Sequence, residues 1–70
     1  MKLFTVINKH GIFAPQTFQE LKNAAEFVVT RPSTQSYIIF EYDNRTDSTK
    51  VHKIGRYATA QNIIDLVMIN

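Results

Sequence analysis

The sequence SYIIFEYD, residues 36–43, is the densest run of β-branched and aromatic residues in this chain. This composition is typical of a β-strand, and its density indicates a strand in the middle of a sheet. Successive side chains of a strand point to opposite faces, so the run has two distinct sides. The sequence predicts that the more apolar side faces the core. The residues of the two sides are Ile38, Phe40 and Tyr42 on the first, and Tyr37, Ile39 and Glu41 on the second.

Two further strands are expected on either side of this run along the chain. Residues 2–9 carry apolar side chains on both faces, which is typical of an interior strand. Residues 50–57 also alternate, but they carry more charge and predict a strand with more contact with solvent. The polar segment 44–49 lies between this strand and residues 36–43, so the two strands are predicted to form a hairpin.

The first helix is predicted to begin at Pro15 to Thr17. Proline is tolerated in the first turn of a helix, and Thr17 and Glu20 have the spacing of a capping box. Apolar residues at helical spacing follow, and Pro32 ends the pattern because proline disfavours helical geometry at the residue before it.

The second helix is predicted near the end of the chain, with Thr59 as its N-cap. Residues 60–68 carry an apolar stripe of helical period that is suited to packing on a sheet. Leu66 and Ile69 are apolar but lie off this stripe. An alternative interpretation therefore makes residues 66–69 a short fourth strand.

The order β-α-β-β-α predicts an α+β two-layer sandwich of one domain, residues 1–70. It has a three-stranded, mainly antiparallel sheet with both helices on one face, as in a shortened ferredoxin-like fold. We number the three predicted strands 1, 2 and 3 in chain order. A crossover that places strand 3 between strands 1 and 2 gives the strand order 1-3-2. The order 3-2-1 places residues 36–43 in the centre and fits the apolar pattern better.

Composition limits the classes of function. The chain has 70 residues, no cysteine and a formal charge of +2, so disulfides, thiolate metal sites and cysteine catalysis are excluded. The mild positive charge is less than a dedicated nucleic-acid binder usually concentrates, and it argues against a DNA mimic. No apolar run is long enough for a membrane-spanning helix, and we expect a cytoplasmic protein with no membrane contact.

A basic cluster in the predicted hairpin is the main candidate for chemistry. Cationic and phenolic side chains of this kind suit phosphate binding in a nucleic-acid-binding protein or, less well, in a small ribonuclease. A solvated hairpin with basic side chains is the favoured interpretation, because alternation separates the cluster onto two faces. The RNA- or DNA-binding alternative uses Arg45, Lys50, His52, Lys53, Arg56 and Tyr57, with sheet-face aromatics.

No metal, cofactor or catalytic site is predicted. His10 and His52 with Asp43 or Glu41 are metal-ligand types, but their spacing matches no recognised zinc motif. The sequence also has no glycine-rich phosphate loop and no nucleophile elbow. We expect a protein that is not an enzyme.

Surplus apolar surface is the feature that points to a function. If both helices cover one side of residues 36–43, the other side has no cover within the chain. The residues expected to bind a partner are Tyr37, Ile39, Leu66, Met68 and Ile69. The leading hypothesis is a binding or regulatory module that acts through protein contact as a homodimer. In size and composition it is similar to small accessory proteins that bacteria and phages encode.

Overall fold

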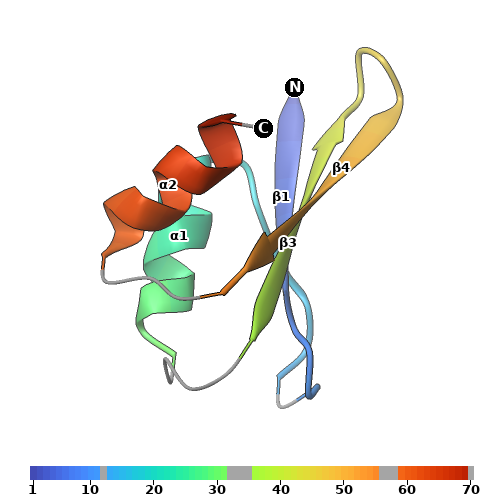
Figure 1. The fold of residues 1–70 in the computed structure, drawn as a ribbon. Helices are drawn as coiled ribbons and strands as arrows, with labels where there is room; N and C mark the ends of the chain where they lie inside the picture. The colour runs from blue at the N-terminus through green and yellow to red at the C-terminus, as the bar shows by residue number, and fades with distance from the viewer. Residues whose placement is uncertain (12, 32–35, 56–58, 70) are drawn as a thin grey trace.

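The computed structural model describes residues 1–11, 13–31, 36–55 and 59–69 (Figure 1). A four-stranded sheet forms one layer, and two helices that lie on the same side of it form the other. The strands lie in the order β2-β1-β3-β4, and every neighbouring pair is antiparallel. The elements are β1 (Lys2–Asn8), β2 (Gln16–Phe18), α1 (Leu21–Val29), β3 (Tyr37–Asp43), β4 (Ser48–Ile54) and α2 (Ala60–Ile69).

The α+β class and the two-layer arrangement are confirmed, but the prediction of three strands is wrong. The additional strand β2 occupies the segment expected to begin the first helix. Gly11, with φ 68°, lies in the turn that leads the chain back along β1, and the hydroxyl oxygens of Thr5 and Thr17 lie 3.0 Å apart. Backbone pairing with β1 therefore replaces the expected capping box. α1 begins later, with Glu20 as an N-cap that makes no side-chain capping bond.

The second helix is confirmed, and the alternative of a fourth strand at residues 66–69 is wrong. Its expected N-cap is also present, since the backbone N–H of Asn62 donates to the hydroxyl of Thr59 at 3.3 Å. Within the described residues, neither helix combines the length and the apolar character needed to cross a membrane.

The three predicted strands correspond to β1, β3 and β4. Their observed order agrees with the 3-2-1 alternative, because β3 lies between β1 and β4. The order 1-3-2 is wrong. β1 and β3 pair along seven positions, from Lys2 opposite Asp43 to Asn8 opposite Tyr37, and form the centre of the sheet. The apolar character of both strands on both faces fits this central position.

The side of β3 that faces the helices is the opposite of the expected one. Tyr37 and Ile39 are 1% and 0% exposed, while Ile38 and Phe40 are only half-buried on the other side. The pairing explains this orientation, because Ile39 lies in register with Val6 on β1 and His52 on β4, both buried. The rest of the apolar core comes from Phe4, Ala24, Ala25, Val28, Ile54, Ile63 and Val67.

The fold consists of two consecutive ββα units. β1, β2 and α1 form the first, and β3, β4 and α2 form the second. The two units occupy equivalent places in the sheet. The first strands of the units, β1 and β3, pair in the centre, and the second strands, β2 and β4, lie at the edges. α1 and α2 pack against each other over the same face of the sheet.

Candidate functional site: an open sheet face and a cavity beside an ionic cluster

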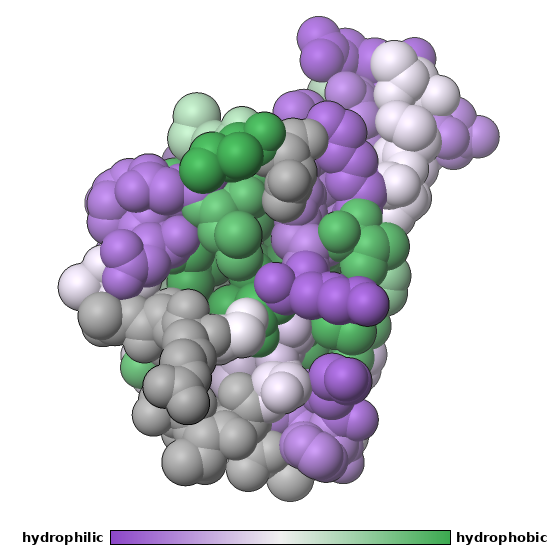
Figure 2. Space-filling view, in the orientation of Figure 1, coloured by the Kyte–Doolittle hydropathy of each residue, from purple (hydrophilic) through white to green (hydrophobic). Residues whose placement is uncertain are grey.

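In the part of the chain that the structure describes, one face of the sheet has no helix over it. We call it the open face, and define it by six large apolar residues: Leu3, Ile7, Ile38, Phe40, Tyr42 and Val51. Five of them are half-buried, and Val51 is 53% exposed. None belongs to the core or to the side chains that pack against it. Hydrophobic side chains are visible on the side of the sheet turned away from the helices (Figure 2).

The middle of the open face is uncharged. Thr5 lies between Leu3 and Ile7 on β1, and its cross-strand neighbour is Phe40, which in turn lies opposite Val51. The positive charge of the described strands on this face belongs to Lys53, opposite Ile38 near one end of β4. Lys9, just beyond the end of β1, lines a second cavity together with Lys53 and Ile38. The surface therefore presents an apolar centre with two cations at one margin.

The ring of Tyr42 lies on the open face, whereas its hydroxyl group forms a hydrogen bond in the β3–β4 turn. The hydroxyl donates to Asp47 Oδ1 at 2.9 Å. This hydrogen bond to a carboxylate, together with partial burial, raises the pKa of the Tyr42 hydroxyl. Tyr42 thus contributes apolar ring surface, and its polar atom is held in the β3–β4 turn.

The five residues expected to bind a partner lie in two separate places. Tyr37 and Ile39 are buried under the helices, so the expectation that they are exposed is wrong. Leu66, Met68 and Ile69 are exposed on α2, as expected. The sequence predicts an exposed Tyr37 and Ile39 because residues 36–43 are apolar on both sides. The sequence of the strand alone does not show which side the helices cover.

A buried ionic cluster joins three strands on the helix-covered face. The Lys2 Nζ lies 2.8 Å from Glu41 Oε2, and His52 Nε2 lies 2.9 Å from Glu41 Oε1. The side chain of Lys2 is 46% exposed, whereas those of Glu41 and His52 are 8% and 1% exposed. His52 Nδ1 is buried without a hydrogen-bond partner among the described residues.

Charge pairing controls the ionisation of this cluster. Burial alone would raise the pKa of Glu41, but hydrogen bonds from Lys2 and His52 outweigh it and hold the pKa below its ordinary value. The same hydrogen bond and the negative charge of Glu41 raise the pKa of Lys2. Glu41 is therefore a carboxylate and Lys2 an ammonium group across the neutral range of pH.

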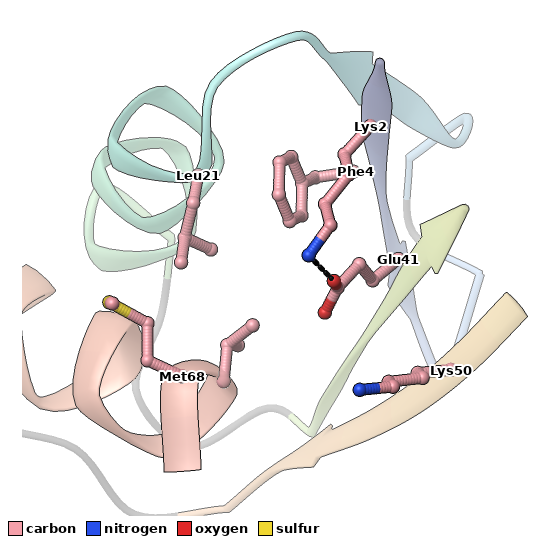
Figure 3. Close-up of a pocket in the computed structure, with 7 residues that line it drawn as sticks. Lys2, Phe4, Leu21, Glu41, Lys50 and Met68 are labelled. Carbon is pink, nitrogen blue, oxygen red and sulfur yellow. Dashed lines mark ion pairs between the residues drawn. The ribbon is translucent and has the colours of Figure 1, made fainter. Parts of the chain in front are cut away.

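A cavity of about 310 Å³ opens beside this cluster, between the sheet and the helices (Figure 3). It lies where β1 begins and α2 ends, at one end of the sandwich. The side chains of Lys2, Glu41 and Lys50 reach it from the strands, and Leu21 and Met68 lie across from them. The lining residues are Lys2, Phe4, Leu21, Glu41, Lys50, Val67 and Met68.

The four expected nucleic-acid-binding residues that the structure describes are not gathered on one surface. His52 is buried and Lys50 lines the cavity, while Lys53 points to the open face. Arg45 binds Asp43 across the hairpin turn, at 3.3 Å between Nη2 and Oδ2. Arg56 and Tyr57 lie outside the described residues.

The buried ionic cluster was missed by the sequence reasoning. Its one signal is Glu41, a carboxylate between two aromatic residues of an apolar strand, which must find a partner if it is buried. The hairpin pattern predicts an exposed His52, but this residue lies at a core-facing position. Within the described part of the chain, no three histidine, cysteine or acidic side chains are grouped so that they could hold a metal ion.

No protein-family model, curated protein or solved structure matches this chain. Functional assignment therefore depends on the surfaces described above. The open face and the cavity lie on opposite sides of the sheet, which makes them separate candidate sites.

Proposed function

We propose that this chain is a non-enzymatic binding module that acts through protein contact, and that its open face binds a second copy of the same chain. The observation that carries the proposal is the group of six large apolar side chains on a sheet face that no helix or strand of the described residues covers. A contiguous apolar patch on a small protein is typical of an interaction surface. Packing two such faces together would remove the apolar side chains from water, as in a β-sandwich.

The charge of the open face favours a second copy over a charged partner. Its central positions on β1 and β3 are uncharged, so two copies can meet without burying an unpaired charge there. Lys53 lies near one end of an edge strand, where it can stay hydrated at the margin of the contact. An isologous contact needs such a self-complementary patch.

The size of the face predicts a weak dimer. Three strands of seven residues, at about 3.3 Å per residue and 4.8 Å between strands, cover a footprint of roughly 23 by 14 Å. Two corrugated faces of this size bury on the order of 1,000 Å² in total, which is at the lower limit for a specific interface. We therefore expect a dissociation constant in the micromolar range.

Sedimentation velocity of the wild-type chain over a wide range of protein concentrations tests this proposal. The mean sedimentation coefficient should rise from the monomer value toward the dimer value across the micromolar range. Phe40→Lys, which places a charge in the centre of the open face, should keep the chain monomeric. Met68→Lys is the matched control on an exposed side chain of α2, and should associate like the wild type.

Two results would overturn the homodimer. One is a wild-type chain that remains monomeric at every concentration. The other is an association that Phe40→Lys leaves unchanged. Circular dichroism of each variant would show whether the fold is kept, so a loss of association can be separated from unfolding.

Nucleic-acid binding is the second candidate, because Phe40 and Tyr42 lie on one central strand of an open sheet face. Exposed aromatic side chains on such a face stack on bases in several classes of RNA-binding protein. The scarcity of cations on this face makes it less favourable, since phosphate contacts supply most of the affinity. Binding of short RNA or DNA that weakens steeply with salt and is lost in Phe40→Lys would support this function. A small ribonuclease is disfavoured because His52 is buried.

Two further expectations, one about the type of fold and one about the origin and cellular location of the protein, are part of this proposal. The cover of one sheet face by two helices supports a variant ferredoxin-like sandwich, although β2 adds a strand to the expected order. The lack of cysteine is consistent with a cytoplasmic regulator from a bacterium or phage. An experimental structure and fractionation of the source cells would test these two points.

A further inference from the structure

We infer that a cavity at one end of the open face binds a small phosphate monoester with an apolar or aromatic body. The cavity, which we call the end cavity, measures about 350 Å³ and is at the lower end of the range for small-molecule sites in proteins. Two lysines line it together with apolar side chains. The lining residues are Lys9, Ser36, Tyr37, Ile38, Lys53, Ile54 and Gly55.

The pairing of three strands fixes the backbone positions of the two lysines on either side of β3. Lys53 on β4 lies opposite Ile38 of β3. Lys9 follows the last residue of β1, and its backbone N–H donates to the carbonyl oxygen of Ser36, just before β3, at 3.0 Å. The fold therefore brings two cations from different strands to one cavity.

In the described part of the chain, no acidic side chain balances the two positive charges of the end cavity. Neither lysine side chain forms an ion pair or a hydrogen bond with a described residue. The segments 32–35 and 56–58, which adjoin the lining along the chain, contain no aspartate or glutamate. Two ammonium groups and no carboxylate give the lining a charge of +2.

The acidic residues of the chain lie elsewhere. Glu41, Asp43 and Asp47 lie toward the other end of the β3–β4 hairpin, and each already has an ion-pair or hydrogen-bond partner. The others belong to the helices or to the N-cap of α1, and the helices cover the opposite side of the sheet from Lys53. These residues are Glu20, Glu26 and Asp65. An anionic ligand in the end cavity would thus meet two cations without a competing carboxylate.

A phosphate monoester matches this charge. It carries a charge of about −1.5 to −2 at neutral pH and presents three acceptor oxygens, whereas a carboxylate carries a single negative charge. Lysine is a common partner of phosphate groups. Ser36, which also lines the cavity, carries a hydroxyl group that can donate a further hydrogen bond.

The apolar lining and the volume define the rest of the ligand. Ile38 lines the cavity as a half-buried side chain, beside the buried residues Tyr37 and Ile54. At about 30 Å³ for each water-sized group, the cavity holds on the order of a dozen non-hydrogen atoms. Phenyl phosphate joins a phosphate group to one aromatic ring within this size, and is a suitable probe.

A nucleic acid fits this site less well than a small molecule does. Its backbone carries one charge for each phosphate, and binding along a strand requires cations that follow the backbone. The cations of the open face are confined to one end, and its central positions on β1 and β3 are uncharged. The inference is therefore a small ligand with its charge concentrated in one group.

Titration of the ¹⁵N-labelled wild-type chain with phenyl phosphate, followed by NMR at about pH 7.5, tests the inference. Saturable shifts should appear at Ile38, Lys53 and Gly55. Phenyl sulfate has the same shape with a single negative charge and should bind about threefold to fivefold more weakly. Phenol, which lacks the anionic group, and inorganic phosphate, which lacks the ring, should each bind about tenfold more weakly or less.

Lys9→Gln and Lys53→Gln each remove one charge from the end cavity, and Lys22→Gln is the matched control. Lys22 is an exposed lysine of α1, in the helical layer. Each cavity variant should weaken phenyl phosphate binding about threefold to fivefold and reduce the preference for phenyl phosphate over phenyl sulfate. Lys22→Gln should bind both probes like the wild type.

Three results would overturn the inference: no saturable binding of phenyl phosphate at millimolar concentration, equal affinity for the four probes, or equal effects of Lys22→Gln and the two cavity variants. Displacement of phenyl phosphate by micromolar oligothymidylate would also overturn it, and would assign the lysines to nucleic-acid binding instead.

Failure of this inference can be distinguished from failure of the proposed homodimer. Sedimentation without any ligand tests the homodimer, whereas the comparison of the probes and lysine variants tests the end cavity. The Phe40→Lys variant should still bind phenyl phosphate at Lys53 and Gly55, and Lys9→Gln should still associate like the wild type.

Discussion

Glu41 couples the stability of this fold to pH. Its carboxylate is nearly buried and accepts hydrogen bonds from Lys2 and His52, which hold its pKa below the ordinary value near 4.5. The unfolded chain therefore binds a proton at Glu41 at a higher pH than the folded chain does. The stabilisation is complete above the unfolded pKa and is lost as pH falls through the lower folded pKa.

Glu41→Gln tests this linkage. We expect the variant to be about 1–2 kcal/mol less stable than the wild type at neutral pH, a value reduced because Lys2 is half-exposed. Its stability should also fall less steeply between about pH 5 and pH 3. The measurement is the free energy of unfolding in urea at each pH. Glu26→Gln, at an exposed position of α1, should keep the wild-type pH dependence; an identical pH dependence in Glu41→Gln would contradict the role of this carboxylate.

Gly11 and Gly55 differ in backbone conformation, although a Cβ atom at either would meet no neighbour within 4 Å among the described residues. Gly11 has φ 68°, in the left-handed region, so Gly11→Ala should cost about 1 kcal/mol through backbone strain alone. Gly55→Ala should be neutral or slightly stabilising, because alanine reduces the freedom of the unfolded chain. Thermal unfolding measures both, and equal melting temperatures for the two variants would contradict this explanation.

At the scale of elements, the position of β2 depends more on contacts with the core than on the strand preference of its three residues. Phe18 lies opposite Phe4 and contacts Phe27 of α1, with ring centroids 5.4 Å apart. Thr17 points to the other side of the sheet, where its hydroxyl contacts Thr5. Besides its backbone pairing with β1, the strand is thus attached to the core through one aromatic side chain.

Phe18→Ala should therefore destabilise the chain by about 2–3 kcal/mol and detach β2 before the rest of the sheet. Hydrogen exchange should show lost protection at residues 16–18 while the pairing of β3 with β4 stays protected. Thr17→Val, the control, should change stability by less than about 0.5 kcal/mol. Uniform loss of protection in all four strands would show that β2 is not a separate unit.

Periodicity was sufficient to predict five of the elements, but it was not sufficient for β2 or for the faces of β3. Pro15 and the Thr17–Glu20 spacing are real helix-start signals, yet the turn at Gly11 allows the chain to pair with β1 first. Residues 36–43 are apolar on both sides, so register with β1 and β4 decides which side is covered. The Lys2–Glu41–His52 cluster depends on the same cross-strand register and was therefore missed.

At the scale of the whole molecule, self-association should appear as a concentration dependence of stability. Binding of a second folded copy stabilises the folded state by mass action. The wild-type melting temperature should rise with protein concentration across the micromolar range, whereas that of Phe40→Lys should not. Differential scanning calorimetry makes the comparison, and a concentration-independent wild-type melting temperature would argue against the dimer.

The two edges of the sheet determine how far such association can proceed. One edge, β2, is only three residues long, and the other, β4, carries lysines at positions 50 and 53. Short strands and lysines are the usual protection against the addition of further strands to a sheet. Growth into fibrils by edge-to-edge pairing is therefore disfavoured, and the proposed contact through the open faces would end with a closed pair. We expect concentrated solutions of this protein to remain free of amyloid.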